Sequence, residues 1–112
     1  MSSTKTDRKL TRELAEMAAR ASAPVAARLT SAFDEIARSG DAFGLAVGEC
    51  APEFVLPNAV GQRVDLEQRL GLGPVVLAFY RGEWCPYCNL TLHALQSALP
   101  RFQAYGASVI AI

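Results

Sequence analysis

The sequence predicts an α/β protein with a pair of N-terminal helices, a β-hairpin, and then a strand–helix–strand unit. Three observations lead to this prediction. Apolar residues recur at helical spacing over residues 7–40, two short apolar segments surround a turn at 59–62, and two continuous apolar runs flank a helical pattern near the C-terminus. We expect residues 1–44 to be a helical extension and residues 45–112 to be part of an α/β domain.

The N-terminal extension is expected to contain two amphipathic helices. The first begins near Asp7, a candidate N-cap, and is interrupted at Pro24, whereas the second ends near Gly40, which suits a left-handed C-cap. The apolar face of the second helix consists of Val25, Leu29, Ala32, Phe33 and Ile36. Such a face covers a core or a neighbouring subunit. A membrane surface is the alternative, and the mixed charges of the polar side disfavour it.

The predicted hairpin pairs residues 47–58 with residues 63–66. Asp65 is a candidate cap for one helical turn that continues to Leu70. Cys50 lies in an irregular segment with no basic or helical context. A passive thiol is therefore the default interpretation of Cys50, and a resolving cysteine is the alternative.

The strand–helix–strand unit begins at Pro74, which opens the apolar run 75–80. A run of this length and composition predicts a strand that is buried on both faces. The following helix is expected to kink or restart at Pro100 and to stop at Gly106, before a second strand over 107–112. In such a unit we expect the two strands to be parallel and the crossover between them to be right-handed, as it is in nearly all proteins.

The segment Trp84-Cys85-Pro86-Tyr87-Cys88 follows the break at residues 81–83 and carries the predicted chemistry. Pro86 suits the first turn of a helix, where its missing N–H costs nothing. Free N–H groups and the helix dipole favour a thiolate at this position. Residues three apart on a helix have Cβ atoms about 5–6 Å apart, which is near the range of a disulfide. Cys85 and Cys88 are therefore predicted to be a reversible dithiol.

The CxxC motif has two other interpretations. A zinc site would need two more ligands, and the chain offers only Cys50 and His93, of which His93 lies off the cysteine face of the predicted helix. Two buried structural cysteines are disfavoured by the strand-to-helix context. We therefore expect a redox site with no metal and no bound cofactor.

Composition excludes several classes of function. The chain has 112 residues, half of them apolar, and eleven charged residues of each sign. This length suits one domain, and the zero net charge does not favour nucleic acid or an anionic membrane as a partner. No stretch is apolar enough to span a bilayer, and the first residues contain no apolar signal region. Together with three cysteines, these features lead us to expect a cytoplasmic protein.

Two motifs resemble the peroxiredoxin family, which comprises the alkyl hydroperoxide reductases and thiol-specific antioxidants. Val47-Gly48-x-x-Ala51-Pro52-x-Phe54-x-Leu56 is similar to the opening hairpin of the family. The segment from Val76 to Cys88 is similar to the active-site segment of a branch with a CxxC motif. The resemblance implies a partial thioredoxin-like fold, because the later strands and a cis-proline loop of the family have no counterpart here. We accordingly expect this chain to be the N-terminal part of a longer protein, or a truncated relative.

The resemblance implies a thiol-dependent antioxidant oxidoreductase, which takes peroxides or disulfides as substrate and a thioredoxin- or glutathione-type thiol as reductant. Peroxiredoxins carry Pro-x-x-x-Thr-x-x-Cys around the reactive thiol, and here Arg81 and Cys85 replace the proline and the threonine. A disulfide reductase without peroxidase activity is therefore the alternative, because Cys-Pro-Tyr-Cys also matches the glutaredoxin dithiol. An inactive interaction module is a third possibility. Under each of these interpretations, the strand–helix–strand unit leaves an open apolar strand edge, which predicts a homo-oligomer.

The order of attack differs between these interpretations. Position on the helix favours Cys85 as the attacking thiol and Cys88 as the resolving one, whereas the peroxiredoxin alignment makes Cys88 the peroxide-reactive thiol. Arg81 is a candidate for holding the thiolate, with a solvated loop charge as the alternative. Trp84, Pro86 and Tyr87 are expected to form the walls of the site, and Glu83 is expected to be a surface carboxylate.

Overall fold

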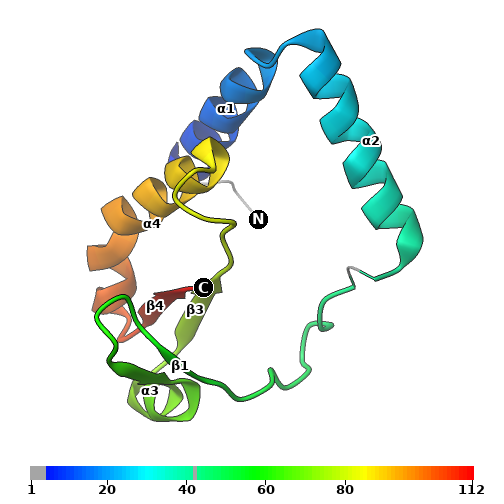
Figure 1. The fold of residues 1–112 in the computed structure, drawn as a ribbon. Coiled ribbons are helices and arrows are strands. Elements are labelled where there is room, and N and C mark those ends of the chain that lie inside the picture. The colour runs from blue at the N-terminus through cyan, green and yellow to red at the C-terminus, as the bar shows by residue number, and fades with distance from the viewer. Residues whose placement is uncertain (1–4, 42) are drawn as a thin grey trace.

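The computed structural model describes residues 5–41 and 43–112. The elements follow one another in the predicted order (Figure 1). They are α1 (Lys5–Ala19), α2 (Ala23–Ser39), β1 (Val55–Pro57), β2 (Arg63–Asp65), α3 (Leu66–Leu72), β3 (Val75–Ala78), α4 (Pro86–Ala104) and β4 (Ser108–Ala111).

The strands β3 and β4 are parallel, as predicted, with Val75 opposite Ser108 and Ala78 opposite Ala111. The pairing continues past the strand ends, because the N–H of Tyr80 donates to the carbonyl of Ile112 at 2.8 Å. Helix α4 forms the crossover between them and packs against β4.

The expectation that the first of these strands runs over 75–80 and is buried on both faces was wrong. Strand β3 ends at Ala78, and its four residues are half-buried. Phe79 is 78% exposed. The physical reason is that β3 has one partner strand among the described residues, so the two-stranded sheet has too little cover to bury an apolar run on both faces.

Helix α4 is continuous through Pro100, so the predicted restart at this residue is not observed. The helix ends at Ala104, and the following Gly106 adopts a left-handed conformation with φ of 70°. This agrees with the prediction that Gly106 terminates the helix.

The strands β1 and β2 form the predicted antiparallel hairpin, with Leu56 opposite Val64. Asn58 closes the turn, because its Oδ1 accepts the N–H groups of Val60 at 3.0 Å and of Gln62 at 2.9 Å. An asparagine that bonds to the backbone two residues ahead is a common way to stabilise a turn.

The first strand of the hairpin is shorter than expected, since strand structure covers Val55–Pro57 and not the whole of 47–58. Pro52 cannot donate a ladder hydrogen bond, and the carboxylate of Glu49 accepts the N–H of Ala46 at 2.9 Å, which folds the segment into a local turn. Asp65 caps α3 as predicted, accepting the N–H of Gln68 at 3.2 Å.

The two N-terminal helices have different surroundings. Helix α1 lies along α4, whereas α2 leads away from α4 and has no buried residue (Figure 1). Gly40 ends α2 with φ of 75°, as predicted. Asp7 lies inside α1 and not at its cap, because the helix is already formed at Lys5. None of the helices in the described residues is long and apolar enough to cross a membrane.

The core is small for a chain of this composition. Within the described residues, Leu66 and Cys85 are the apolar residues that are fully buried, at 3% and 5% exposure. Large apolar side chains on several elements stay exposed, among them Phe33, Phe43, Leu72, Trp84 and Tyr105. A cysteine of the CxxC motif is thus one of the two best-buried side chains.

Candidate dithiol site

Cys85 is the N-cap residue of α4. Its φ of −87° and ψ of 108° are extended, as an N-cap requires, and Pro86 occupies the first turn of the helix. The sequence therefore places the first cysteine where the helix presents unpaired N–H groups. Figure 1 shows this start of α4 just beyond the loop that follows β3.

The two sulfurs of the motif lie 2.8 Å apart, with Cys88 Sγ donating to Cys85 Sγ. The backbone N–H of Cys88 also donates to Cys85 Sγ, at 3.4 Å. Both cysteines are free thiols. A covalent S–S bond is about 2.05 Å long, so a small movement of the two side chains would join the sulfurs.

These contacts lower the pKa of Cys85 below the ordinary value for a thiol. The largest cause is the hydrogen bond from the Cys88 side chain, followed by that from the Cys88 backbone. Burial acts in the opposite direction, and the N–H of Tyr87 and the positive charge of Arg81 make smaller contributions in favour of the thiolate. A hydrogen bond to the charged form favours that form, so the site stabilises the Cys85 thiolate.

Arg81 contacts the site through its backbone and its side chain. Its N–H donates to Cys88 Sγ at 3.5 Å, and its guanidinium carbon lies 5.2 Å from the centroid of the Trp84 ring. The second contact is a cation–π interaction. Arg81 and Trp84 are both exposed, so they lie at the outer edge of the site.

Asn89 holds the loop before the helix and was not identified from the sequence. Its Nδ2 donates to the carbonyl of Glu83 at 2.8 Å, and its N–H donates to the carbonyl of Cys85 at 3.0 Å. The Glu83 side chain is exposed, as expected. An amide four residues after the N-cap cysteine is the only signal in the sequence that could have suggested this contact.

Access to the two cysteines is unequal. Cys85 is only 5% exposed, whereas Cys88 lines a cavity of about 490 Å³. Leu14 and Ala15 of α1 form part of the wall of this cavity, together with Tyr80 and residues of α4. The N-terminal extension therefore helps to build the surroundings of the dithiol, which the sequence did not predict.

Tyr87 separates two cavities. One is the cavity beside Cys88, and the other, of about 270 Å³, lies between α1 and α2 and is also bordered by Arg81 and Phe33. Tyr87 is half-buried, and its role in the wall of the site stays a prediction. Pro86, by contrast, is exposed.

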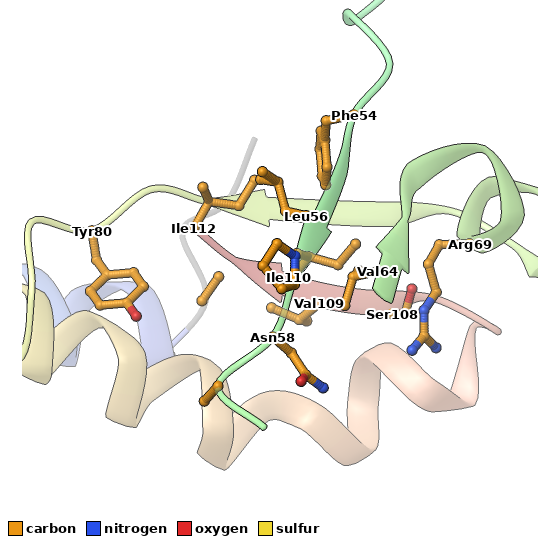
Figure 2. Close-up of a pocket in the computed structure, with 13 residues that line it drawn as sticks. Phe54, Leu56, Asn58, Val64, Arg69, Tyr80, Ser108, Val109, Ile110 and Ile112 are labelled. Atoms are coloured by element: carbon orange, nitrogen blue, oxygen red, sulfur yellow. The ribbon is translucent and has the colours of Figure 1, made fainter. Parts of the chain in front are cut away.

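Another cavity lies away from the dithiol. It has a volume of about 590 Å³ and lies between the hairpin and β4, lined by Phe54, Leu56, Tyr80 and Ile110 among others (Figure 2). No cysteine borders it. The exposed Cys50 lies in the irregular segment before β1, and the described residues contain no cluster of three or more histidine, cysteine or acidic side chains that could hold a metal.

A parallel strand followed by a helix that begins at a CxxC motif places this chain among the thioredoxin-like proteins, here with part of that fold. Residues 47–112, more than half of the chain, match the family model described as AhpC/TSA. The chain therefore belongs to the AhpC/TSA family, as the two motifs indicated. No solved structure matches it significantly.

The curated relatives carry the name thiol-disulfide oxidoreductase ResA. The protein of Geobacillus thermodenitrificans is 34% identical over 68 residues, which are 61% of this chain and 38% of that protein. The protein of Bacillus subtilis is 32% identical over 58% of this chain and 35% of its own length, and that of Bacillus anthracis is 30% identical over 59% and 37%. The chain thus matches little more than a third of the length of these relatives.

Proposed function

We propose that this protein is a thiol–disulfide oxidoreductase that works through Cys85 and Cys88. The observation that carries the proposal is the 2.8 Å approach of the two sulfurs at the N-terminus of α4. The names of the curated relatives support the same class of reaction. No metal or organic cofactor is needed, because the two thiols supply both electrons.

In the proposed reaction, the Cys85 thiolate attacks one sulfur of a disulfide substrate. A mixed disulfide forms and the other half of the substrate leaves as a thiolate, which takes up a proton. Cys88 then loses its proton and attacks Cys85 Sγ, which releases the second half of the substrate as a thiol. The substrate gains two electrons and two protons, and Cys85 and Cys88 become a disulfide. A small or protein dithiol of the thioredoxin or glutathione type would restore the reduced form.

Reduction of a peroxide is the second candidate, and the unequal access to the two cysteines favours it. Cys88 borders a cavity while Cys85 is buried, so an incoming molecule would meet Cys88 first. The Cys88 thiolate would attack the peroxide O–O bond and become a sulfenic acid, releasing an alcohol or water. Cys85 would then displace the sulfenic oxygen as water and form the same disulfide.

The proposed cycle consumes thiols, so it requires a reducing compartment. We expect this compartment to be the cytoplasm. Fractionation of cells that produce the protein tests this location. Recovery of the protein outside the cytoplasm would contradict it.

Rapid mixing distinguishes the two substrates. Trp84 is the only tryptophan and directly precedes Cys85, so its emission reports oxidation of the dithiol. The reduced protein is mixed with a stoichiometric small disulfide or with hydrogen peroxide, and Cys85→Ser, Cys88→Ser and Cys50→Ser are measured beside it. Cys50→Ser is the matched control, since it removes an exposed thiol outside the site.

The expected result is a fast change with the disulfide that Cys85→Ser abolishes and Cys50→Ser leaves unchanged. A fast change with peroxide that Cys88→Ser alone abolishes would instead identify a peroxidase. No response to either oxidant would contradict both candidates and favour the non-catalytic interaction module.

A further inference from the structure

Gly82 occupies the position between Arg81 and the Glu83-Trp84 pair, and it is the glycine with the closest side-chain neighbour. Its φ is 137°, a conformation that residues with a side chain rarely adopt. A Cβ atom placed there would lie 2.6 Å from Nε1 and 2.8 Å from Cδ1 of the Trp84 ring. The indole therefore lies directly against the backbone of Gly82, at a distance that only glycine permits.

The place of the Trp84 ring determines what Arg81 contacts. The ring is 65% exposed, so little other packing holds it. The guanidinium of Arg81 lies 5.2 Å from its centroid. In the part of the chain that the structure describes, no carboxylate pairs with Arg81, and the ring is the partner that orients its charge.

Arg81 and Gly82 also touch the dithiol through the backbone. The N–H of Arg81 donates to Cys88 Sγ at 3.5 Å, and the carbonyl of Gly82 accepts the N–H of Cys85 at 3.2 Å. The same three residues, Arg81, Gly82 and Trp84, thus form one unit in contact with both cysteines.

We propose that Gly82 is a positioning residue of the dithiol, because it admits the Trp84 ring against the chain and so holds the Arg81 side chain over that ring, next to the backbone contact of Arg81 with Cys88 Sγ. This inference deepens the proposed function and rests on it. Neither of the measurements that test it requires a substrate of the enzyme.

Gly82→Ala is the direct test. The added methyl group displaces the indole, so the emission of Trp84 changes in the reduced protein. Arg81 loses its partner, and the alkylation of Cys85 at neutral pH becomes slower by roughly twofold to fivefold, because the positive charge no longer favours the thiolate. Alkylation is measured in a Cys50→Ser background and assigned to Cys85 by peptide mass.

Gly48→Ala is the matched control. Gly48 also has a positive φ, of 94°, but nothing lies within 4 Å of an added Cβ atom. This variant carries the backbone strain without the collision. It is expected to leave the Trp84 emission and the alkylation rate unchanged, and helical circular dichroism checks that both variants are folded.

A second pair of variants tests the inference without altering Gly82. Trp84→Phe keeps an aromatic face for Arg81, and Trp84→Ala removes it. Alkylation of Cys85 should be slower in Trp84→Ala than in Trp84→Phe, and adding Gly82→Ala to Trp84→Ala should slow it little further. Equal alkylation rates of Cys85 in Trp84→Phe and Trp84→Ala would overturn the inference. So would an effect of Gly82→Ala on this rate that is as large in the Trp84→Ala background as in the wild-type protein. If the wild-type protein reduced no oxidant, the proposed function would fail, but the alkylation rates of Cys85 in these variants could still be compared.

Discussion

Cys85 combines two properties that oppose each other. Its place as N-cap of α4 and the hydrogen bonds from Cys88 favour a thiolate, whereas its burial disfavours charge. The hydrogen bonds outweigh burial, so the pKa of Cys85 is lowered. A group with a lowered pKa is ionised over a wider pH range, and its reactivity is lost only as the pH falls through that lowered pKa.

The pH dependence of Cys85 alkylation tests the cause of this shift. In a Cys50→Ser background, the alkylation rate of Cys85 should reach half its maximum at a lower pH than that of an unstructured cysteine peptide. Cys88→Ala removes the largest cause, so its half-maximum should lie at higher pH. Cys88→Ser keeps an O–H donor, so its half-maximum should lie between that of the wild-type protein and that of Cys88→Ala. Coincident profiles for the Ala and Ser variants would show that the Cys88 side chain is not the cause.

The sequence singled out the residues of the candidate site, but not the contacts that position them. Cys85, Cys88, Arg81 and Trp84 stand together in one short motif, so their proximity follows from their spacing. The contact of Gly82 with the Trp84 ring depends on a backbone angle, which a motif does not specify.

At the scale of elements, local signals predicted the structure best. The cap of α3, the left-handed glycine after α2 and the turn of the hairpin depend on residues within a few positions of one another. Strand lengths and burial were predicted less well, because they depend on partners that are distant in the chain. The run 75–80 has the composition of a doubly buried strand but only one neighbouring strand in the described residues.

Removing the cap of α3 should destabilise the hairpin and the short helix together. Asp65→Ala deletes the acceptor for the N–H of Gln68 and is expected to lower the free energy of unfolding by about 1 kcal/mol. Asp65→Asn keeps an oxygen at this position and should cost much less. Both substitutions also remove the 3.4 Å ion pair between Asp65 and Arg63. This pair contributes little to the free energy of unfolding, because the Arg63 side chain is largely exposed to solvent. Urea unfolding followed by circular dichroism measures both variants, and equal losses would assign the effect to the ion pair.

At the scale of the whole molecule, the exposed apolar surface is the dominant feature. Half of the residues are apolar, yet few of those that the structure describes are buried, and the exposed ones include Phe33 and Ile36 on helix α2, which has no buried residue. Apolar surface of this extent favours association. The sequence could not predict how little of the expected apolar surface is covered, since burial depends on which elements meet in space.

We therefore predict that the 112-residue chain self-associates. Multi-angle light scattering at micromolar concentration should give a mass above 12.0 kDa that falls on dilution. Phe33→Ser and Ile36→Ser on α2 should weaken the association, whereas substitution of the exposed polar residue Gln96 on α4 should not. A compact monomer over the whole concentration range would contradict the prediction.

We expect Cys85 and Cys88 to form a reversible redox pair in which Cys50 takes no part. Peptide mapping by mass spectrometry tests this pairing directly. The reduced protein is oxidised with one equivalent of diamide, and its free thiols are then blocked. The peptides are analysed before and after treatment with a dithiol. The expected result is one disulfide, within the Cys85–Cys88 peptide, that the dithiol reopens, with Cys50 blocked as a free thiol throughout. A disulfide that includes Cys50, or the absence of any bond between Cys85 and Cys88, would contradict it.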